Sequence, residues 1–174
     1  IDGMDSDMAS RFFITHFFNP PRYMKLVEII PSEKTNADLI PPMAVFLEEA
    51  LGKGVVYAKD TPNFIANRIG VYGMMVTLEE ARKKQLSIED VDGLTGSLIG
   101  RPKSATFRTA DVVGLDTMCF VANTAYEKCT NDPERETFNI PDYLQKMVDN
   151  EWLGQKSKQG FYKKIDKGVI HSID

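Results

Sequence analysis

Two strand-like segments joined by a short proline-containing connection constrain the start of this 174-residue chain more than any other feature. Residues 11–18 and 25–30 are rich in aromatic and β-branched side chains, which favour strands. An antiparallel pair centred on Arg22 puts His16 directly opposite Glu28, with their Cβ atoms roughly 4.5–5.5 Å apart on one face. The sequence therefore predicts a β-hairpin that places one of the chain's two histidines beside a carboxylate.

A histidine and a carboxylate arranged in this way can move a proton. The carboxylate fixes one ring nitrogen as a donor, leaves the other as the proton acceptor, and stabilises the imidazolium that forms. His16 is thus a candidate general base and Glu28 its partner. The same spacing also fits an ordinary polar contact between two strands, and the residues alone leave both interpretations open.

Four motifs spread over residues 11–163 resemble, in the same order, the 3-hydroxyacyl-CoA dehydrogenase family. They are HFFNP with MKLVE (residues 16–20 and 24–28), KDTPNFIANR (59–68), ADVVGLD (110–116) and KSKQGFY (156–162). In that family they correspond to the catalytic segment, a strand-to-helix crossing, a mid-domain helix break and a closing turn. Four motifs in one order are a far more specific signal than any single one.

The pattern of the chain changes near residue 60. Residues 36–52 are predicted to form a helix that begins or bends near Ile40, because two prolines follow and prolines are tolerated only in a first turn. Residues 54–59 read as a further strand, and after Thr61 the apolar residues recur at helical spacing. The fold class is therefore predicted to be α+β, with a few strands followed by an all-helical part.

The resemblance gives these two parts an interpretation. Residues 1–60 resemble the C-terminal strands of a truncated, Rossmann-type NAD-binding domain. Residues 61–174 resemble the helical C-terminal domain, which is similar to that of 6-phosphogluconate dehydrogenase.

The helical part carries several local start and stop signals. Ser87 precedes two acidic residues, which is typical of a helix start. Residues 106–129 are predicted to form one helix broken at Gly114, with Asp116 capping its second half. Residues 79–84 are expected to form a solvated charged helix face. Residues 160–162 and 169–170 suggest a short terminal hairpin.

The resemblance also implies roles for individual residues. His16 would take the proton from the 3-hydroxyl of the substrate, and Glu28 would orient and support it. Asn67 would hydrogen-bond the reacting oxygen, Lys156 would contact the cofactor, and Asn19 would help to position the nicotinamide or the histidine. Each of the last three also has an ordinary interpretation: a first-turn helix asparagine, a solvated lysine and a turn residue before a proline.

The activity that the resemblance implies is the NAD-dependent oxidation of (S)-3-hydroxyacyl-CoA to 3-oxoacyl-CoA in fatty acid β-oxidation. The implied partners are an acyl-CoA substrate, a second copy bound through the helical domain, and a fused enoyl-CoA hydratase domain as in the long branch of the family. Three positions depart from the commoner pattern: Asn63 stands in place of a glycine, Lys158 replaces a small residue, and residues 103–106 replace a Met-Gly-Pro segment.

The chain contains no Gly-x-Gly-x-x-Gly turn for the phosphates of a dinucleotide. Its nearest approach, at residues 52–54, lacks the third glycine and reads better as a helix end before a strand. The resemblance therefore implies that NAD is bound mainly by residues N-terminal to this chain. We expect residues 1–174 by themselves not to oxidise hydroxyacyl-CoA.

Composition excludes several other classes of function. The net charge of −4 and pI near 5.3 give no basic field for nucleic acid. No apolar run reaches the roughly 18–20 residues of a membrane span, and the acidic start is unlike a signal peptide. The sequence predicts a soluble, cytoplasmic protein.

The remaining reactive side chains carry no predicted chemistry. Cys119 and Cys129 are expected to be reduced thiols, with Cys119 buried and inert. His171 is expected at the surface, with no metal site. Two alternatives remain: a helical dimerisation or assembly module without catalysis of its own, and a hydrolase, which lacks a nucleophile at a recognisable turn.

Overall fold

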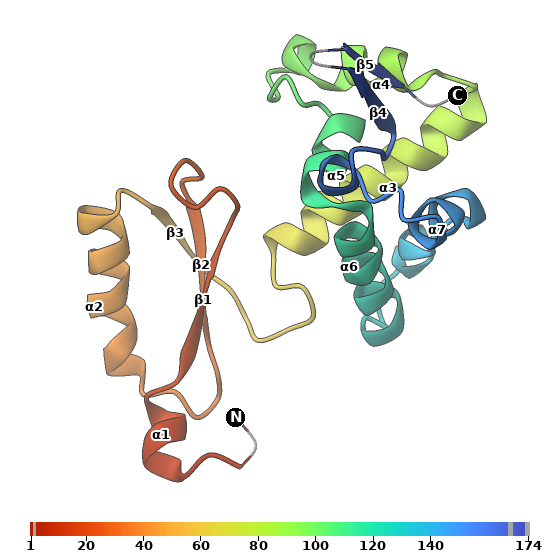
Figure 1. The fold of residues 1–174 in the computed structure, drawn as a ribbon. Coiled ribbons are helices and arrows are strands. Elements are labelled where there is room, and N and C mark those ends of the chain that lie inside the picture. The colour runs from red at the N-terminus through yellow and green to blue at the C-terminus, as the bar shows by residue number, and fades with distance from the viewer. Residues whose placement is uncertain (2, 167–168, 173–174) are drawn as a thin grey trace. The chain divides into compact units, whose positions relative to one another are not determined.

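The computed structural model describes residues 1, 3–166 and 169–172. The chain forms two compact units, Ile1–Ile65 and Ala66–Asp174. The first unit combines a small sheet with helices, and the second is built mainly of helices (Figure 1). Each unit has its own apolar core. The predicted α+β class is confirmed.

The first unit is built on a three-stranded sheet with the order β1-β2-β3. Its strands are β1 (Phe13–Phe17), β2 (Leu26–Pro31) and β3 (Gly54–Tyr57). β1 pairs antiparallel with β2 in the register that puts His16 opposite Glu28, so the predicted hairpin and its register are confirmed. β3 adds to β2 in parallel. A short helix before the sheet, α1 (Ser6–Ser10), was not predicted.

One helical segment connects β2 to β3. It runs through a 3₁₀ turn, an α-helix and a π-helical stretch: η1 (Ala37–Leu39), α2 (Ile40–Val45) and η2 (Phe46–Ala50). The α-helix begins at Ile40 with both prolines in its first turn, as predicted. Ala44 and Leu47 pack with Val27 and Ile29 of β2 and form the core of this unit.

The second unit contains five α-helices among its described residues. They are α3 (Ala66–Lys84), α4 (Ile88–Thr95), α5 (Phe107–Val113), α6 (Leu115–Lys128) and α7 (Asp142–Asp149). Shorter elements are η3 (Ser97–Ile99), η4 (Arg135–Phe138), η5 (Gln155–Ser157), β4 (Tyr162–Asp166) and β5 (Val169–Ser172). α6 contributes several fully buried side chains to the core, where Phe138 and Leu144 join it.

Several local predictions for the helical unit are confirmed. Ser87 caps α4 and forms a capping box with Asp90. The predicted helix is broken at Gly114, whose φ of 98° ends α5 before α6 begins. β4 and β5 form the predicted terminal hairpin. One prediction was wrong: Asp116 is not the cap of α6, because it lies inside the first turn and its carboxylate pairs with Lys156.

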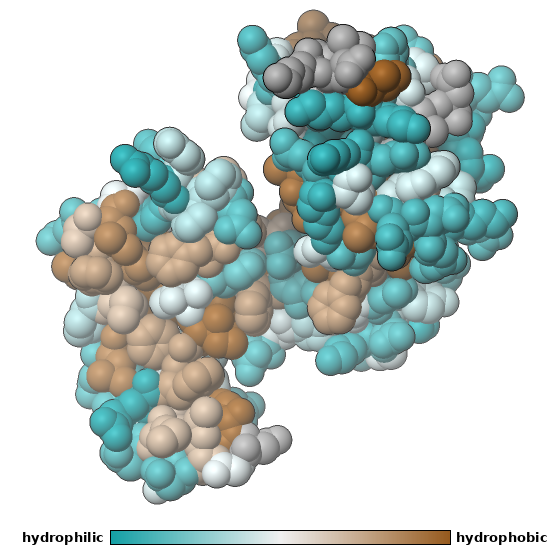
Figure 2. All heavy atoms as spheres, viewed as in Figure 1, coloured by the Kyte–Doolittle hydropathy of each residue, from teal (hydrophilic) through white to brown (hydrophobic). Residues whose placement is uncertain are grey.

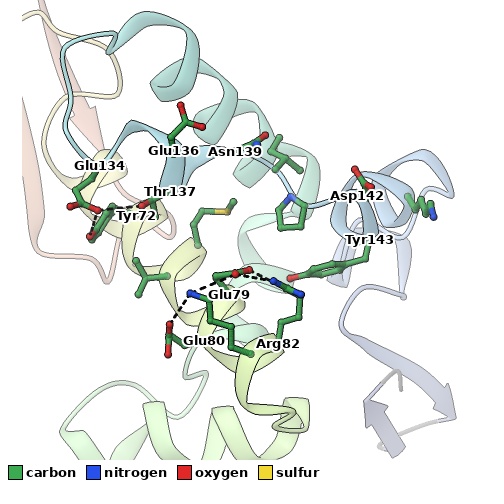
Figure 3. Close-up of a pocket in the computed structure, with 16 residues that line it drawn as sticks. Tyr72, Glu79, Glu80, Arg82, Glu134, Glu136, Thr137, Asn139, Asp142 and Tyr143 are labelled. Carbon is green, nitrogen blue, oxygen red and sulfur yellow. Dashed lines mark hydrogen bonds and ion pairs between the residues drawn. The ribbon is translucent and has the colours of Figure 1, made fainter.

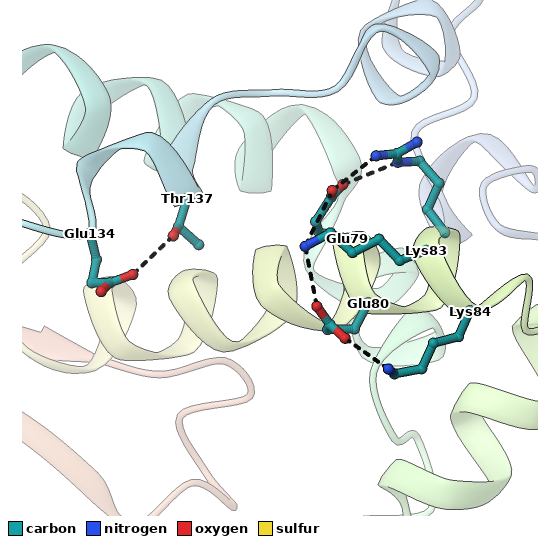
Figure 4. A network of polar contacts seen from close by, with 7 residues as sticks. Glu79, Glu80, Lys83, Lys84, Glu134 and Thr137 are labelled. Carbon is teal, nitrogen blue, oxygen red and sulfur yellow. Dashed lines mark hydrogen bonds and ion pairs between the residues drawn. The ribbon is translucent and has the colours of Figure 1, made fainter.

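The charged run at the end of α3 is the solvated helix face that the sequence predicts. Glu79 pairs with Arg82, and Glu80 pairs with Lys83 and Lys84, at the i+3 and i+4 spacings of a helix (Figure 4). These side chains remain between 40% and 63% exposed. The run therefore serves the surface of α3 and offers no paired-carboxylate site.

The two units differ in the surface that each shows to the viewer in Figure 2. Brown and light-brown side chains gather on the first unit, whereas the face of the helical unit is mostly hydrophilic. Large apolar side chains of the first unit that are exposed include Val45, Phe46 and Leu51 around its helical segment. Exposed apolar surface of this kind is typical of a region that contacts another domain or another protein.

Candidate functional site

The best candidate site lies on the β1–β2 hairpin. The Nδ1 atom of His16 lies 2.7 Å from Oε2 of Glu28. The two residues face each other directly across the antiparallel pair. The Glu28 side chain is 1% exposed and that of His16 is 26% exposed, so the carboxylate is buried while the imidazole reaches solvent.

The Glu28 carboxylate is held from a second direction. Its Oε1 atom accepts a hydrogen bond of 3.0 Å from the backbone N–H of Ile65, which lies 37 residues further along the chain. A buried carboxylate needs such partners, because an unpaired buried charge is costly. The orientation of Glu28 is therefore fixed by both His16 and the segment before α3.

That segment makes an unusual turn. Asn63 and Phe64 both lie in the left-handed region, with φ values of 64° and 52°. The N–H of Phe64 donates to the carbonyl of Thr61 at 3.0 Å. The ring of Phe64 lies 5.6 Å from the imidazole of His16, and the ring of Phe18 lies 4.6 Å from it, both tilted. The histidine is thus flanked by two aromatic rings.

This arrangement suits proton transfer. With the Nδ1–H of His16 donating to Glu28, Nε2 is the acceptor of the neutral ring. A proton taken up at Nε2 creates an imidazolium that the adjacent carboxylate stabilises. Sequence reasoning predicted this pair from its spacing, and the structure places the two side chains in hydrogen-bond contact.

The other predicted site residues lie elsewhere in the chain. Asn19 is exposed in the bend after β1, before a cis Asn19–Pro20 peptide bond. Asn67 is the second residue of α3 in the helical unit and is partly buried. The predicted roles of both residues remain predictions.

Lys156, the predicted cofactor lysine, has a partner inside the helical unit. Its Nζ atom lies 2.6 Å from both carboxylate oxygens of Asp116. The lysine holds the pKa of Asp116 below its usual value. Gly114 permits this approach, because a Cβ there would lie 2.9 Å from the Asp116 carboxylate and 3.2 Å from Nζ. The predicted contact of Lys156 with a cofactor stays a prediction.

Asp111 joins the third and fourth sequence motifs. Its buried carboxylate accepts hydrogen bonds from the backbone N–H groups of Phe161 and Tyr162 at 2.8 and 2.9 Å. Burial raises the pKa of Asp111, and these two hydrogen bonds act in the opposite direction. Gly154 and Gly160 pack directly on Asp111, where no side chain fits. This cluster is a structural joint of the helical unit.

The helical unit also carries a groove of about 920 Å³ between α3, η4 and α7. Charged side chains line it: Glu79 pairs with Arg82, and Glu134 accepts hydrogen bonds from the hydroxyls of Tyr72 and Thr137 (Figure 3). Burial raises the pKa of Tyr143 at its edge to about 12. None of its lining residues is a histidine or a cysteine, so the groove lacks a base suited to neutral pH.

No group of three or more histidine, cysteine, aspartate or glutamate side chains among the described residues is placed to hold a metal ion. No described helix combines the length and the apolarity that a membrane span needs.

Sequence reasoning missed the groups that surround the pair. The Ile65 N–H and the ring of Phe64 reach the site only because of the left-handed turn. One signal could have indicated this turn, since Asn63 stands where the resemblance expects glycine. The other two positions that differ from the family pattern also have positive φ values: Lys158 has a φ of 64°, and Ala105, which lies within residues 103–106, has a φ of 48°.

Comparisons with known proteins agree with the motifs. Residues 3–61 match the family model described as 3-hydroxyacyl-CoA dehydrogenase, NAD binding domain. Residues 64–164 match the model described as 3-hydroxyacyl-CoA dehydrogenase, C-terminal domain. The two matches meet close to the boundary between the compact units at Ile65.

Individual relatives point the same way. A probable 3-hydroxyacyl-CoA dehydrogenase of Bacillus subtilis is 54% identical over 99% of this chain and 22% of its own length. One from Deinococcus radiodurans is 47% identical over 94% of this chain and 46% of its own length. The crystal structure of M. tuberculosis FadB2 matches with a TM-score of 0.80 and 30% identity, over 89% of this chain and 53% of that one.

This chain spans less than half the length of these two curated relatives. Both of its compact units nevertheless correspond to a domain of the same enzyme family, and together the two family models cover almost all of it. The chain belongs to the 3-hydroxyacyl-CoA dehydrogenase family.

Proposed function

We propose that this chain supplies the base and the substrate domain for the NAD-dependent oxidation of (S)-3-hydroxyacyl-CoA to 3-oxoacyl-CoA in fatty acid β-oxidation. The observation that carries the proposal is the His16–Glu28 pair, with a 2.7 Å contact and a buried carboxylate. Oxidation of a secondary alcohol needs a base for the hydroxyl proton, and this pair has the chemistry of such a base.

The proton and the hydride leave the substrate for different acceptors. Nε2 of His16 accepts the proton of the 3-hydroxyl while the hydrogen on C3 leaves with its electron pair, and the C–O bond becomes a carbonyl. Glu28 stabilises the imidazolium through Nδ1. In the reverse direction the same imidazolium returns its proton to the oxygen.

NAD is the cofactor of the family, as the description of the matched N-terminal domain states. When bound, it accepts the hydride from C3. A bound substrate can reach His16, because the imidazole reaches solvent while its Glu28 partner is buried. The 174 residues contain no Gly-x-Gly-x-x-Gly turn, so they do not fit the phosphates, and we assign no residue to them.

Three further residues complete the proposal. Asn67, at the start of α3, hydrogen-bonds the reacting oxygen of the substrate, and Asn19, after β1, helps to position the nicotinamide. Lys156 contacts the cofactor from the pair it forms with Asp116. Support for these roles comes from the family's motifs rather than from contacts.

A homodimer formed through the helical unit and a cytoplasmic location are part of the same proposal. Large apolar side chains stand in solvent on α3, α5 and α6, with Ile69, Val112 and Phe120 at 67%, 61% and 72% exposed. Such side chains favour a protein interface. A fused enoyl-CoA hydratase domain is supported by two Rickettsia relatives named putative fatty acid oxidation complex trifunctional enzyme, each 32% identical to this chain over 22–23% of its own length.

The test is a steady-state assay of the full-length protein with NAD and 3-hydroxyacyl-CoA substrates of increasing chain length. We expect NADH and 3-oxoacyl-CoA to form in equal amounts. Free 3-hydroxybutyrate serves as the control that lacks CoA, and residues 1–174 alone should produce no NADH. A full-length protein that is folded but forms no NADH with any of these thioesters would refute the proposal.

A further inference from the structure

We infer that Phe64 and the backbone N–H of Ile65 are positioning groups for the His16 base. Neither touches the substrate in this account; both act through His16 and Glu28. The inference rests on the proposed function of His16. It adds residues 63–65 to the groups that hold the His16–Glu28 pair.

The Ile65 N–H helps to determine how the Glu28 carboxylate is turned. It occupies Oε1 at 3.0 Å, which directs Oε2 toward Nδ1 of His16 at 2.7 Å. Hydrogen bonds to a charged acceptor are stronger than neutral ones, and this one is formed in a buried place. A shift of Ile65 would therefore let the carboxylate rotate and weaken its hold on the imidazole.

The conformation that presents this N–H is strained. A residue other than glycine in the left-handed region costs roughly 1–2 kcal/mol, and a bulky one such as Phe64 is an outlier there. Two such residues in a row, Asn63 and Phe64, precede Ile65. Strained backbone persists where surrounding contacts over-determine it and is concentrated at functional sites. The contacts here include those of Phe64 and Ile65 with the His16–Glu28 pair.

The Phe64 ring restrains the imidazole itself. With the two rings 5.6 Å apart at 57°, and Phe18 at 4.6 Å and 58°, His16 has aromatic neighbours that limit its rotation. Restricted rotation keeps Nδ1 on Glu28 and leaves Nε2 as the acceptor. Misplacement of a base by about 1 Å can cost on the order of a hundredfold in rate.

The experiment compares Phe64→Leu, which removes the ring, with Phe64→Tyr, which keeps it, in the full-length protein. We expect Phe64→Leu to lower kcat about tenfold with less than about a twofold change in KM, and Phe64→Tyr to remain within about twofold of wild type. The pH profile of kcat/KM should shift only in Phe64→Leu. Phe46→Leu, at an exposed ring of the same unit, is the matched control.

Hydrogen exchange at the Ile65 amide gives a second readout that does not depend on turnover. We expect protection in wild type and exchange at least about tenfold faster in Phe64→Leu. If Phe64→Leu does not fold, hydrogen exchange at the Ile65 amide of the wild-type protein is the test. Slow exchange supports the inference, and exchange at the rate of an exposed amide overturns it.

Two results separate this inference from the proposed function. If His16→Gln is inactive but Phe64→Leu keeps wild-type kcat, pH profile and Ile65 exchange, the positioning role is overturned and the function stands. If His16→Gln keeps wild-type kcat, His16 is not the base, and both the function and this inference fall.

Discussion

Gly160 lies so close to Asp111 that a Cβ at this glycine would come within 2.0 Å of the aspartate Oδ1. This contact joins two sequence motifs that lie about 50 residues apart, because the Asp111 carboxylate of one accepts hydrogen bonds from the two backbone N–H groups that follow the glycine of the other. The first two motifs meet in the same manner, through Glu28 and Ile65. The four motifs are thus two structural joints, one in each unit.

Gly160→Ala should destabilise the helical unit. The added methyl has no space beside Asp111 and Gly154, and overpacking of this kind costs about 1–3 kcal/mol. Urea unfolding followed by the fluorescence of Trp152, the single tryptophan, measures the change. Gly70→Ala in α3 is the matched control, because a Cβ at this position meets nothing within 4 Å. Alanine favours a helix more than glycine does, so this substitution should raise the free energy of unfolding by about 0.5–1 kcal/mol. Equal effects of the two substitutions would contradict this account.

Lys158→Gly should stabilise the protein. Lys158 has a φ of 64°, a conformation that costs a residue with a side chain roughly 1–2 kcal/mol of stability. Glycine removes this strain, but it loses more backbone entropy on folding, which offsets about 0.5–1 kcal/mol of the gain. The expected net gain is about 0.5–1 kcal/mol in urea unfolding. Lys158→Ala removes the same charge but keeps the Cβ, so it should bring no gain; a gain of equal size in both variants would point to charge instead of backbone strain.

The two free thiols should differ in reactivity. Burial raises the pKa of Cys119 to about 11, so at pH 8 only about one molecule in a thousand carries its thiolate, whereas Cys129 is partly exposed. A thiol reagent should modify Cys129 quickly and Cys119 only after unfolding. The thiolate fraction of Cys119 rises tenfold per pH unit below its pKa. Cys129→Ser should abolish the fast phase, and a fast phase that survives in this variant would show that Cys119 is accessible.

Glu28→Gln should impair proton transfer while preserving the fold around it. The amide oxygen can still accept the Ile65 N–H, but the amide nitrogen then faces Nδ1 of His16 and forces the proton onto Nε2, the wrong tautomer for a base. We expect kcat to fall about 10²–10⁴-fold in the full-length protein. The control is Glu33→Gln at an exposed position. Wild-type turnover by Glu28→Gln would mean that the carboxylate does not assist His16.

Sequence patterns were sufficient for the elements whose signals are local. The register of β1 and β2 follows from the position of one short connection, and this was enough to pair His16 with Glu28. The helix break at Gly114 and the capping box at Ser87 depend on residues a few positions apart. Local chemistry determines these features, so they can be read from one sequence.

Features that depend on distant residues escaped prediction. Asp116 looked like a helix cap, but Lys156, 40 residues away, takes its carboxylate. The N–H of Ile65 reaches Glu28 through a turn that ordinary side chains disfavour, so no propensity indicates it. α1 is only five residues long and gives no periodic signal. Long-range partners and strained backbone are therefore what the structure adds.

The most direct test of the central claim is the rate of NADH formation from 3-hydroxybutyryl-CoA by the full-length protein and two histidine variants. His16→Gln removes the proposed base, and His171→Gln changes the other histidine, which is exposed on β5. We predict that His16→Gln lowers kcat about 10²–10⁴-fold, whereas His171→Gln leaves it within about twofold of wild type. Wild-type turnover by a folded His16→Gln protein would contradict the account.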